Sequence, residues 1–353
     1  MRILIVKLSS IGDVVHTLPA AALLRRAMPK AHISWVVERR ASEILKGSAA
    51  IDELIEIDTR AWRKSALSRE TLADIRTKLG RVRSGMSTNG ASATAIDVAI
   101  DFQGLIKSGV VALATGAARR VGFETAELRE KASRVFLNEQ VATSHARHVV
   151  DKNIALARSI IAGDRTAEPR YEFPIHVSPE DEEYAERVLA RVGGAFAIIN
   201  PGGGWPTKLW SADRYGELAD WLWTDRKMKS IVTFGPGEEP LAEAVARASR
   251  TGAAHPEPST LKQYVALARR ASLFVGGDTG PLHLAAASRT PIVGLYGPTS
   301  PERNGPFDDR DITVGRDLWC RADCHRRSCW HWECMEIPVG EVIEAVSKRL
   351  SES

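Results

Sequence analysis

Residues 2–13 have the sequence RILIVKLSSIGD, and this stretch decides the fold class. Its first part, Arg2–Lys7, is an apolar run of the length and composition of a buried strand. Its second part is a short loop in which Gly12 permits a tight turn. Apolar side chains then recur at helical spacing over Val14–Met28. A buried strand, a loop and a helix in this order predict the start of a parallel α/β unit.

The same alternation continues along the whole chain. The predicted strands are Arg2–Lys7, His32–Val37, Glu53–Ile57, Ile96–Ile100, Ala195–Asn200, Lys229–Phe234, Leu273–Val275 and Ile292–Tyr296. The predicted helices are Val14–Met28, Ala41–Lys46, Ala61–Arg83, Leu105–Leu113, Glu180–Val192, Tyr215–Trp223, Leu261–Ala271, Pro281–Ser288 and Val339–Leu350. We therefore expect an α/β protein with two Rossmann-like doubly wound domains, whose ligands bind in a cleft at loops that follow strands.

A polar, proline-containing stretch, Gly163–Pro174, divides the two series and places the boundary near residues 165–178. We expect an N-terminal domain over 1–170, a C-terminal domain over 171–338 and a last amphipathic helix within 339–353. The segment Ser84–Thr94 is rich in Ser, Gly, Thr and Asn, which predicts a mobile surface loop. A chain of 353 residues is long enough for two cores of this size.

Composition and charge narrow the function. The hydrophobic fraction of 44% and the charged fraction of 26% are typical of a soluble globular protein. No apolar run is long enough to span a membrane, and the N-terminus lacks a secretory signal, so we expect a cytoplasmic protein.

The charges are unevenly distributed along the chain. Residues 1–165 hold 26 Lys and Arg against 17 Asp and Glu, a net +9, and the remainder holds 22 against 27, a net −5. A basic half predicts an anionic partner. Basic runs with interleaved aromatic residues are absent, so nucleic acid is not expected.

Asp13 is the candidate chemical group of the first loop. It lies at the start of a helix, where a carboxylate is a favoured cap and suits the helix dipole. The alternative is a general base, held by a rigid strand end at the mouth of a cleft. The loop is not a dinucleotide-binding turn, because it has no G-x-G-x-x-G pattern.

Two loops of the C-terminal half predict a phosphate site. Residues 201–211, PGGGWPTKLWS, follow a strand, and Gly203 and Gly204 allow backbone N–H groups to approach a phosphate while Lys208 supplies the counter-charge. The alternative is a simple glycine-rich turn.

The other loop, residues 276–283, also follows a strand and has the sequence GGDTGPLH. Asp278, Thr279, Gly280 and His283 would present N–H groups, a hydroxyl and an imidazole at one helix end, which suits a diphosphate. Here too, capping by Asp278 or Thr279 is the alternative. The nearby residues 235–239, GPGEE, offer a carboxylate for sugar or ribose hydroxyls.

All four cysteines lie within residues 320–334, interleaved with His325 and His331: Cys320, Cys324, Cys329 and Cys334. Clustered Cys and His predict a zinc site, but the gaps of three, four and four residues lack the two-residue gap common in zinc motifs. Reduced thiols, structural zinc and a disulfide all stay open.

Taken together, these segments resemble glycosyltransferase family 9, the ADP-heptose:lipopolysaccharide heptosyltransferases. The resemblance extends over nearly the whole chain, in residues 1–20 (MRILIVKLSSIGDVVHTLPA), 101–109 (DFQGLIKSG), 200–210 (NPGGGWPTKLW), 234–239 (FGPGEE) and 276–307. Trp62-Arg63-Lys64 and Arg129-Glu130 are most similar to heptosyltransferase I, which adds the first heptose to Kdo on the lipid A inner core. The form of residues 280–283 and the loop Pro298–Phe307 resemble the second and third heptosyltransferases.

The resemblance implies a GT-B fold with a role for each matching position. Asp13 would be the catalytic base. The donor ADP-heptose would bind Gly203, Gly204, Lys208, Glu239, Asp278, Thr279, Gly280 and His283. The acceptor, Kdo-lipid A or inner-core lipopolysaccharide, would bind Ser10, Gly12, Arg60, Arg63, Lys64, Asp101, Gln103, Lys107 and Arg129. The family has hydroxyl residues where this chain has Gly203 and Gly204, so the backbone would serve there.

The resemblance also implies an inverting single displacement with no cofactor. Asp13 would take the proton of the acceptor hydroxyl, and the cluster of Lys208, Thr279 and Gly280 would face it and stabilise the leaving diphosphate. No Asp-x-Asp motif occurs in a cleft loop, so no metal is expected. The acceptor implies peripheral contact with the cytoplasmic face of the inner membrane. The alternatives are a family 9 transferase with another donor or acceptor, a GT-B sugar-nucleotide epimerase, and a non-catalytic glycan-binding protein with Trp62 as a sugar platform.

Overall fold

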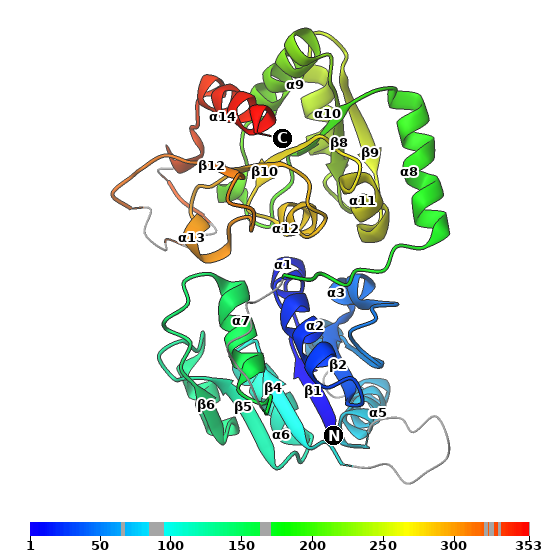
Figure 1. The fold of residues 1–353 in the computed structure, drawn as a ribbon, viewed down its shortest axis with the longest axis vertical. Coiled ribbons are helices and arrows are strands. Elements are labelled where there is room, and N and C mark those ends of the chain that lie inside the picture. Colours follow the sequence, from blue (N-terminus) through cyan, green and yellow to red (C-terminus); the bar gives the residue numbers. More distant parts are fainter. Residues whose placement is uncertain are drawn as a thin grey trace. The chain divides into compact units, whose positions relative to one another are not determined.

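The computed structural model describes residues 1–64, 68–84, 95–162, 171–320, 324, 328–330 and 333–352. The chain divides into two compact units, Met1–His176 and Val177–Ser353, each built on its own six-stranded parallel sheet (Figure 1). The loop predicted over Ser84–Thr94 lies outside the described residues, except for Ser84, which ends a helix.

The sheet of the first unit has the strand order β3-β2-β1-β4-β5-β6. Its strands are β1 (Arg2–Val6), β2 (His32–Glu38), β3 (Glu53–Ile57), β4 (Val98–Asp101), β5 (Arg119–Phe123) and β6 (Glu139–Val141). This is the order of a doubly wound nucleotide-binding fold, in which the chain turns back between β1 and β4. Ligands bind such sheets beyond the carboxyl ends of the strands at this switch point.

Strand β1 lies at the centre because it is the most apolar segment of the unit. Residues 3–6 are fully buried, and each pairs in parallel with β2 on one side and β4 on the other. The register sets Val6 beside both Val36 and Asp101. The loop after β1 and the loop after β4 therefore begin as neighbours, and these loops carry Asp13 and Gln103.

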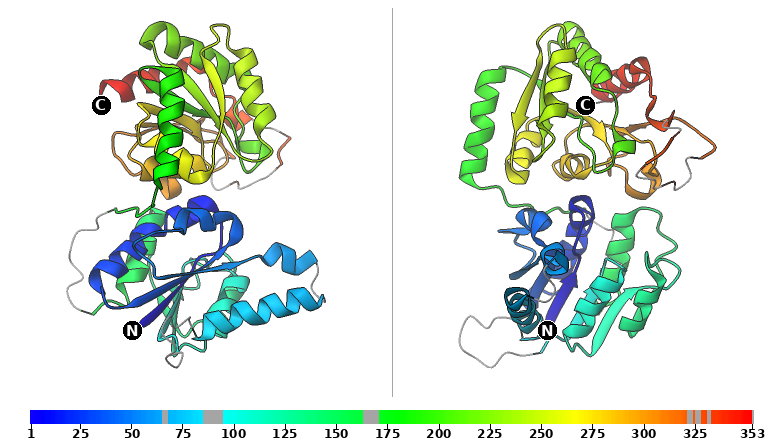
Figure 2. Two further views of the ribbon diagram at one scale, coloured as in Figure 1. Left: turned by 90° about the vertical axis from the view of Figure 1, so that its right-hand side faces the viewer. Right: turned by 180° about the vertical axis from the view of Figure 1, so that it is seen from behind.

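Helices cover both faces of each sheet (Figure 2). Those of the first unit are α1 (Ile11–Val15), α2 (Leu18–Ala27), α3 (Arg39–Ser42), α4 (Thr59–Lys64), α5 (Arg69–Ser84), α6 (Ile106–Ala114) and α7 (Val149–Arg158), with 3₁₀ turns η1 (Glu43–Leu45) and η2 (Lys131–Phe136). The prediction of one helix over Val14–Met28 was wrong. The helix is divided at His16 and Thr17, because Pro19 starts α2 as one of its first two residues and has no N–H to continue α1.

The second unit repeats the same topology with different residues. Its sheet has the order β12-β11-β10-β7-β8-β9, so the chain turns back between β7 and β10. The strands are β7 (Phe196–Asn200), β8 (Lys229–Phe234), β9 (Ala254–Pro258), β10 (Leu273–Gly277), β11 (Ile292–Leu295) and β12 (Ile312–Val314). The loops that hold Lys208 and Asp278 follow β7 and β10, which pair with Asn200 beside Gly276.

Helices also flank this second sheet. They are α8 (Pro179–Val192), α9 (Ala212–Arg226), α10 (Glu239–Ala248), α11 (Leu261–Ala268), α12 (Gly280–Ala287), α13 (Pro301–Asn304) and α14 (Val339–Ser351), with 3₁₀ turns η3 (Pro206–Lys208) and η4 (Glu333–Met335). The last helix, α14, packs against α9, β11 and β12 and buries Val342 and Val346 in the core of this unit.

The predicted α/β class with two parallel sheets is confirmed. Four strands were not predicted from the sequence, namely β5, β6, β9 and β12. Three of them lie at a sheet edge and carry charged, polar or proline residues, so the apolar run that marks the inner strands is absent. Within the described part of the chain, no helix has the length and apolar character needed to cross a membrane.

Two glycines within helices differ in the space around them. A Cβ added at Gly216 in α9 would lie 2.7 Å from the backbone carbonyl carbon of Ala248, whereas a Cβ at Gly80 in α5 would meet nothing within 4 Å. Alanine favours a helix over glycine by about 1 kcal/mol, but overpacking against backbone costs about 1–3 kcal/mol.

We therefore predict that Gly216→Ala lowers the free energy of unfolding while Gly80→Ala raises it by about 0.5–1 kcal/mol. Chemical denaturation of both variants beside the wild type measures this. Stabilisation by Gly216→Ala would contradict the close approach of α9 to the end of α10.

Candidate active site

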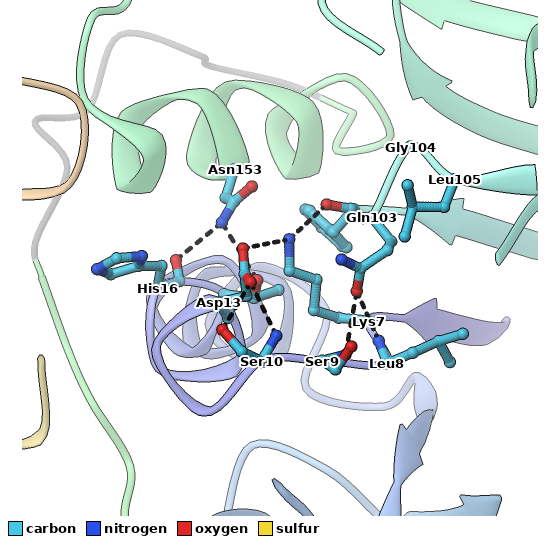
Figure 3. Close-up of polar contacts among 12 residues, drawn as sticks. Lys7, Leu8, Ser9, Ser10, Asp13, His16, Gln103, Gly104, Leu105 and Asn153 are labelled. Atoms are coloured by element: carbon cyan, nitrogen blue, oxygen red, sulfur yellow. Dashed lines mark hydrogen bonds and ion pairs between the residues drawn. The ribbon is translucent and has the colours of Figure 1, made fainter. Parts of the chain in front are cut away.

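Asp13 is held in one orientation by the loop after β1 (Figure 3). The Ser10 backbone N–H and hydroxyl both donate to Asp13 Oδ2, at 2.8 and 2.9 Å. Ser10 is thus the N-cap of α1, and Asp13 closes the reciprocal capping contact from the third helical position. The cap that the sequence suggested for Asp13 is therefore present, but Asp13 is not the N-cap itself. Its side chain remains 27% exposed, which leaves it accessible to a ligand.

The other carboxylate oxygen of Asp13 lies over a buried lysine. Lys7 ends the apolar run of β1 and is 4% exposed. Its Nζ donates to the Phe102 carbonyl at 2.7 Å and lies 3.5 Å from Asp13 Oδ1. A buried ammonium needs opposite charge close by, and the Asp13 carboxylate supplies it. Lys7 was not among the predicted site residues, since a lysine at a strand end gives no sign of burial.

Gln103, which follows β4, holds this loop (Figure 3), and Asp101 holds Gln103. Gln103 Oε1 accepts from the Leu8 and Ser9 backbone N–H groups at 3.0 and 3.1 Å. Asp101 in turn accepts from the Gln103 backbone N–H at 2.8 Å and from the Ser108 hydroxyl at 2.9 Å. Asp101 is fully buried and Gln103 is 4% exposed. Gln103 therefore fixes the two loops to each other, and Asp101 holds the loop that carries Gln103. Their predicted contact with an acceptor stays a prediction.

Charges in this cluster shift one another's pKa values. Desolvation raises the pKa of Asp13, but the Lys7 ammonium and the Ser10 hydrogen bonds outweigh it and hold the pKa below its usual value. Burial lowers the pKa of Lys7, and the two nearby carboxylates only partly oppose this. Burial raises the pKa of Asp101 to about 6 despite its hydrogen bonds. The lowered pKa keeps Asp13 ionised at neutral pH.

Helix α7 fixes the far end of α1. The Asn153 amide donates to the His16 carbonyl at 3.0 Å and to the Thr17 hydroxyl at 3.2 Å (Figure 3). These two residues form the break between α1 and α2, where helical carbonyls lack an internal partner. Neither α7 nor Asn153 was predicted from the sequence.

The predicted basic acceptor residues differ in their surroundings. Arg60 and Lys64 are exposed on α4, whereas the side chain of Arg63 lies outside the described part. Arg129 is exposed and contributes to the lowered pKa of Asp13. Lys107 Nζ lies 3.3 Å from Glu38, and its ammonium is thereby partly neutralised.

Trp62, the proposed sugar platform, instead packs against the core. Its indole N–H donates to Asp74 of α5 at 2.8 Å.

In the second unit, Asp278 is the centre of a buried polar cluster. Lys208 Nζ donates to Asp278 Oδ2 and to its backbone carbonyl, both at 2.7 Å. His283 Nε2 lies 3.1 Å from Asp278 Oδ1, and the Asn304 amide donates to the same oxygen at 2.7 Å. Desolvation opposes ionisation of Asp278, but His283 and Lys208 hold its pKa far below the usual range. The structure thus brings together residues from the loops after β7, β10 and β11.

Backbone groups complete this part of the second unit. Thr279 is the N-cap of α12, and Gly280 is its first residue, so the first N–H groups of α12 lie directly after Asp278. Gly203 and Gly204 precede η3, and a Cβ added at Gly204 would meet nothing within 4 Å. Lys208 also lies 4.8 Å above the ring centre of Trp205. A cation beside the N-terminus of a helix is suited to binding phosphate.

Two adjacent glutamates after β8 have different positions. Glu238 is the N-cap of α10, and its Oε2 accepts from the Gly235 N–H at 3.1 Å. A Cβ added at Gly202 would lie 2.5 Å from the same oxygen, so the Glu238 carboxylate lies directly against the loop after β7. Glu239, the residue assigned from the sequence, is the first residue of α10 and is exposed. The sequence could not show which glutamate faces the loop after β7, because this depends on which of the two is the N-cap of α10.

None of the four cysteines forms a disulfide, and each has intermediate exposure. Burial and the neighbouring thiols Cys329, Cys320 and Cys324 raise the pKa of Cys334. His325 and His331 lie outside the described residues. Among the residues that the structure does describe, no three Cys, His, Asp or Glu side chains are placed to hold a metal ion.

The two units, each on a parallel six-stranded sheet, have the architecture of the GT-B class. Residues 91–331 match the family model described as glycosyltransferase family 9 (heptosyltransferase). Lipopolysaccharide heptosyltransferase 1 of Escherichia coli K12 is 30% identical over 326 residues, which cover 91% of this chain and 94% of that protein. The Pseudomonas aeruginosa lipopolysaccharide heptosyltransferase 1 is 28% identical, with coverage of 93% and 87%.

A solved structure of E. coli heptosyltransferase WaaC with ADP has the same fold. It matches with a TM-score of 0.78 and 24% identity, covering 99% of this chain and 100% of that one. The chain belongs to glycosyltransferase family 9 and is a glycosyltransferase.

Proposed function

We propose that this enzyme transfers heptose from ADP-L-glycero-D-manno-heptose to Kdo of the lipopolysaccharide inner core, with inversion at the anomeric carbon. The observation that carries this is the Asp13 carboxylate, partly exposed and fixed by Ser10 and Lys7 at the carboxyl end of β1. Two kinds of similarity support the donor: the names of the similar heptosyltransferases, and a related solved structure of E. coli WaaC with ADP-2-deoxy-2-fluoro heptose.

In this proposal the second unit binds the donor. Lys208, His283 and the N-terminus of α12 lie beside Asp278 and would hold the diphosphate, with Thr279, Gly280, Gly203 and Gly204 as neutral donors. A carboxylate after β8 would accept hydrogen bonds from the sugar or ribose hydroxyls. We assign that role to Glu238, because it is the carboxylate against Gly202.

The first unit then binds the acceptor and supplies the base. The acceptor hydroxyl attacks the anomeric carbon as the bond to the diphosphate oxygen breaks, and Asp13 takes the hydroxyl proton. The two electrons of the broken bond leave with ADP, where Lys208 stabilises the added negative charge. Asp13 is a weak base in the ground state because its pKa is lowered, so it accepts the proton as the new bond forms.

We assign the acceptor's anionic groups to Arg60, Arg63, Lys64 and Arg129, with Ser10 and Gly12 beside the attacking hydroxyl. The net +9 of residues 1–165 suits a phosphorylated glycolipid. Such an acceptor places the reaction at the cytoplasmic face of the inner membrane, with the enzyme bound peripherally.

The proposal predicts that Asp13→Asn slows heptosyl transfer to Kdo-lipid A by about 10²–10⁴-fold and leaves ADP-heptose affinity nearly unchanged. Asparagine keeps an oxygen for the Ser10 contacts but cannot take a proton. Initial rates with calorimetry of donor binding measure both quantities. Near-normal turnover would reduce Asp13 to a helix cap, and conversion of ADP-heptose without any acceptor would favour a sugar-nucleotide epimerase.

The two glutamates after β8 give a matched pair of variants. We predict that Glu238→Gln weakens binding of ADP-heptose by about tenfold, the effect of losing one charge-assisted hydrogen bond of about 1.5 kcal/mol. Glu239→Gln should bind like the wild type. Calorimetric titration of both variants with ADP and with ADP-heptose compares them, and loss of affinity only in Glu239→Gln would reverse the assignment.

A further inference from the structure

Helix α6 exposes an apolar stripe that the proposed transfer does not use. Ile106, Val110 and Leu113 recur at i, i+4 and i+7 and are 44%, 47% and 48% exposed, whereas Ser108, Gly109, Val111 and Ala112 of the same helix are buried. Most surface helices of a globular protein turn the apolar face inward. Here a second apolar face remains open to solvent.

The 3₁₀ turn η2 extends this surface. It packs along α6, and a Cβ added at Gly109 would lie 2.5 Å from the Phe136 ring. Val135 of η2 is 71% exposed. We call the exposed side chains of these two packed elements the α6–η2 patch, and its apolar members are Ile106, Val110, Leu113 and Val135.

Basic side chains accompany the apolar ones. Arg129, Lys131 and Arg134 are exposed on η2 and on the residues before it. In the part of the chain that the structure describes, no carboxylate forms an ion pair with any of the three. Glu130, the acidic residue between Arg129 and Lys131, accepts a hydrogen bond from the Ile106 backbone N–H at 2.7 Å. The patch therefore combines exposed apolar groups with a net positive charge.

This patch is continuous with the loop that braces Asp13. The Glu130 N–H donates to the Gly104 carbonyl at 3.1 Å, and Gly104 follows Gln103, whose side chain holds Leu8 and Ser9. Helix α6, whose first residue is Ile106, thus begins two residues after Gly104, beside the loop that holds Gln103. A surface that bound this patch would lie beside the loop that presents Asp13.

We propose that the α6–η2 patch docks on an anionic lipid bilayer, with its apolar side chains in the interfacial region and its cations against lipid phosphates. Apolar residues flanked by Lys and Arg are the chemistry of interfacial membrane binding. A second copy of this chain is a poorer occupant, because it would bring three cations against three cations. The proposal rests on the proposed function for its purpose, since a lipid-anchored acceptor would be reached from that bilayer.

Co-sedimentation with sucrose-loaded vesicles tests the docking directly. The wild type should bind vesicles of phosphatidylcholine and phosphatidylglycerol and bind pure phosphatidylcholine vesicles much less. Lys131→Glu/Arg134→Glu should weaken binding to the anionic vesicles by about 25-fold or more, at about fivefold for each charge lost. Ile106→Ser/Val110→Ser/Leu113→Ser should weaken it by about tenfold or more.

Matched controls separate the patch from general charge and hydrophobicity. Lys30→Glu/Arg40→Glu makes the same charge change at exposed positions elsewhere in the first unit, and Trp330→Ser removes an 88% exposed apolar side chain of the second unit. Both should bind vesicles like the wild type, and thermal melting should show that every variant is folded. Equal loss in the patch and control variants would overturn the proposal.

Activity assays distinguish this proposal from the proposed function. Patch variants should lose rate on Kdo-lipid A embedded in anionic vesicles but keep the wild-type rate on a deacylated, water-soluble form of the same acceptor. A wild type that transfers to neither acceptor would overturn the proposed function. The co-sedimentation of patch and control variants would still show whether the α6–η2 patch binds the bilayer. Patch variants that bind vesicles normally but no longer self-associate would overturn the docking proposal in favour of an interface between copies.

Discussion

The arrangement of the first unit depends on one buried ammonium. Lys7 lies at the carboxyl end of the central strand, where burial makes an isolated positive charge costly. The Phe102 carbonyl and the Asp13 carboxylate compensate it, so the loops after β1 and β4 must stay close together. Gln103 completes the link between the loops by accepting two hydrogen bonds from the backbone after β1, and Asp101 holds the Gln103 backbone N–H and the Ser108 hydroxyl. Asp13 is therefore fixed by groups on two neighbouring strands.

The second unit has the same topology but buries a charge of the opposite sign. There the buried charge is the Asp278 carboxylate, and the Lys208 ammonium, the His283 imidazole and the Asn304 amide surround it. Lys208 and His283 come from loops that follow β7 and β10, the two strands at the switch point. One unit thus holds a carboxylate in place with a buried lysine, and the other holds a lysine in place with a buried carboxylate. This matches a base in one unit and a diphosphate site in the other, as the proposed function requires.

Much of the fold could be predicted because its inner strands are continuous apolar runs. The strands around Ile3–Val6 and Ile198–Ile199 are buried on both faces, and their pattern shows this directly. The edge strands β6 and β12 have three residues each, too few to show a pattern, so only pairing with a neighbour identifies them. The loops with Asp13, Lys208, Asp278 and His283 could be found because they follow predicted strands.

Other parts of the site depend on contacts between distant segments. Asn304 joins Asp278 from 26 residues away, and Asn153 holds His16 from 137 residues away. Local sequence gives no sign of either contact. Burial of Lys7 and the choice between Glu238 and Glu239 likewise follow from tertiary packing and cap geometry, not from residue type.

The central claim is that Lys7 holds Asp13 ionised and oriented for catalysis, and the pH dependence of kcat/KM for the Lys7→Met variant tests it most directly. Methionine keeps the length and apolar stem of lysine but removes the charge that lowers the pKa of Asp13. A carboxylate that loses an opposite charge at this range rises in pKa by about 1–3 units. The acid limb of the profile should therefore move to higher pH in the variant than in the wild type. A limb at the same pH in both proteins, with activity lowered equally at every pH, would contradict the account and leave Lys7 a purely structural residue.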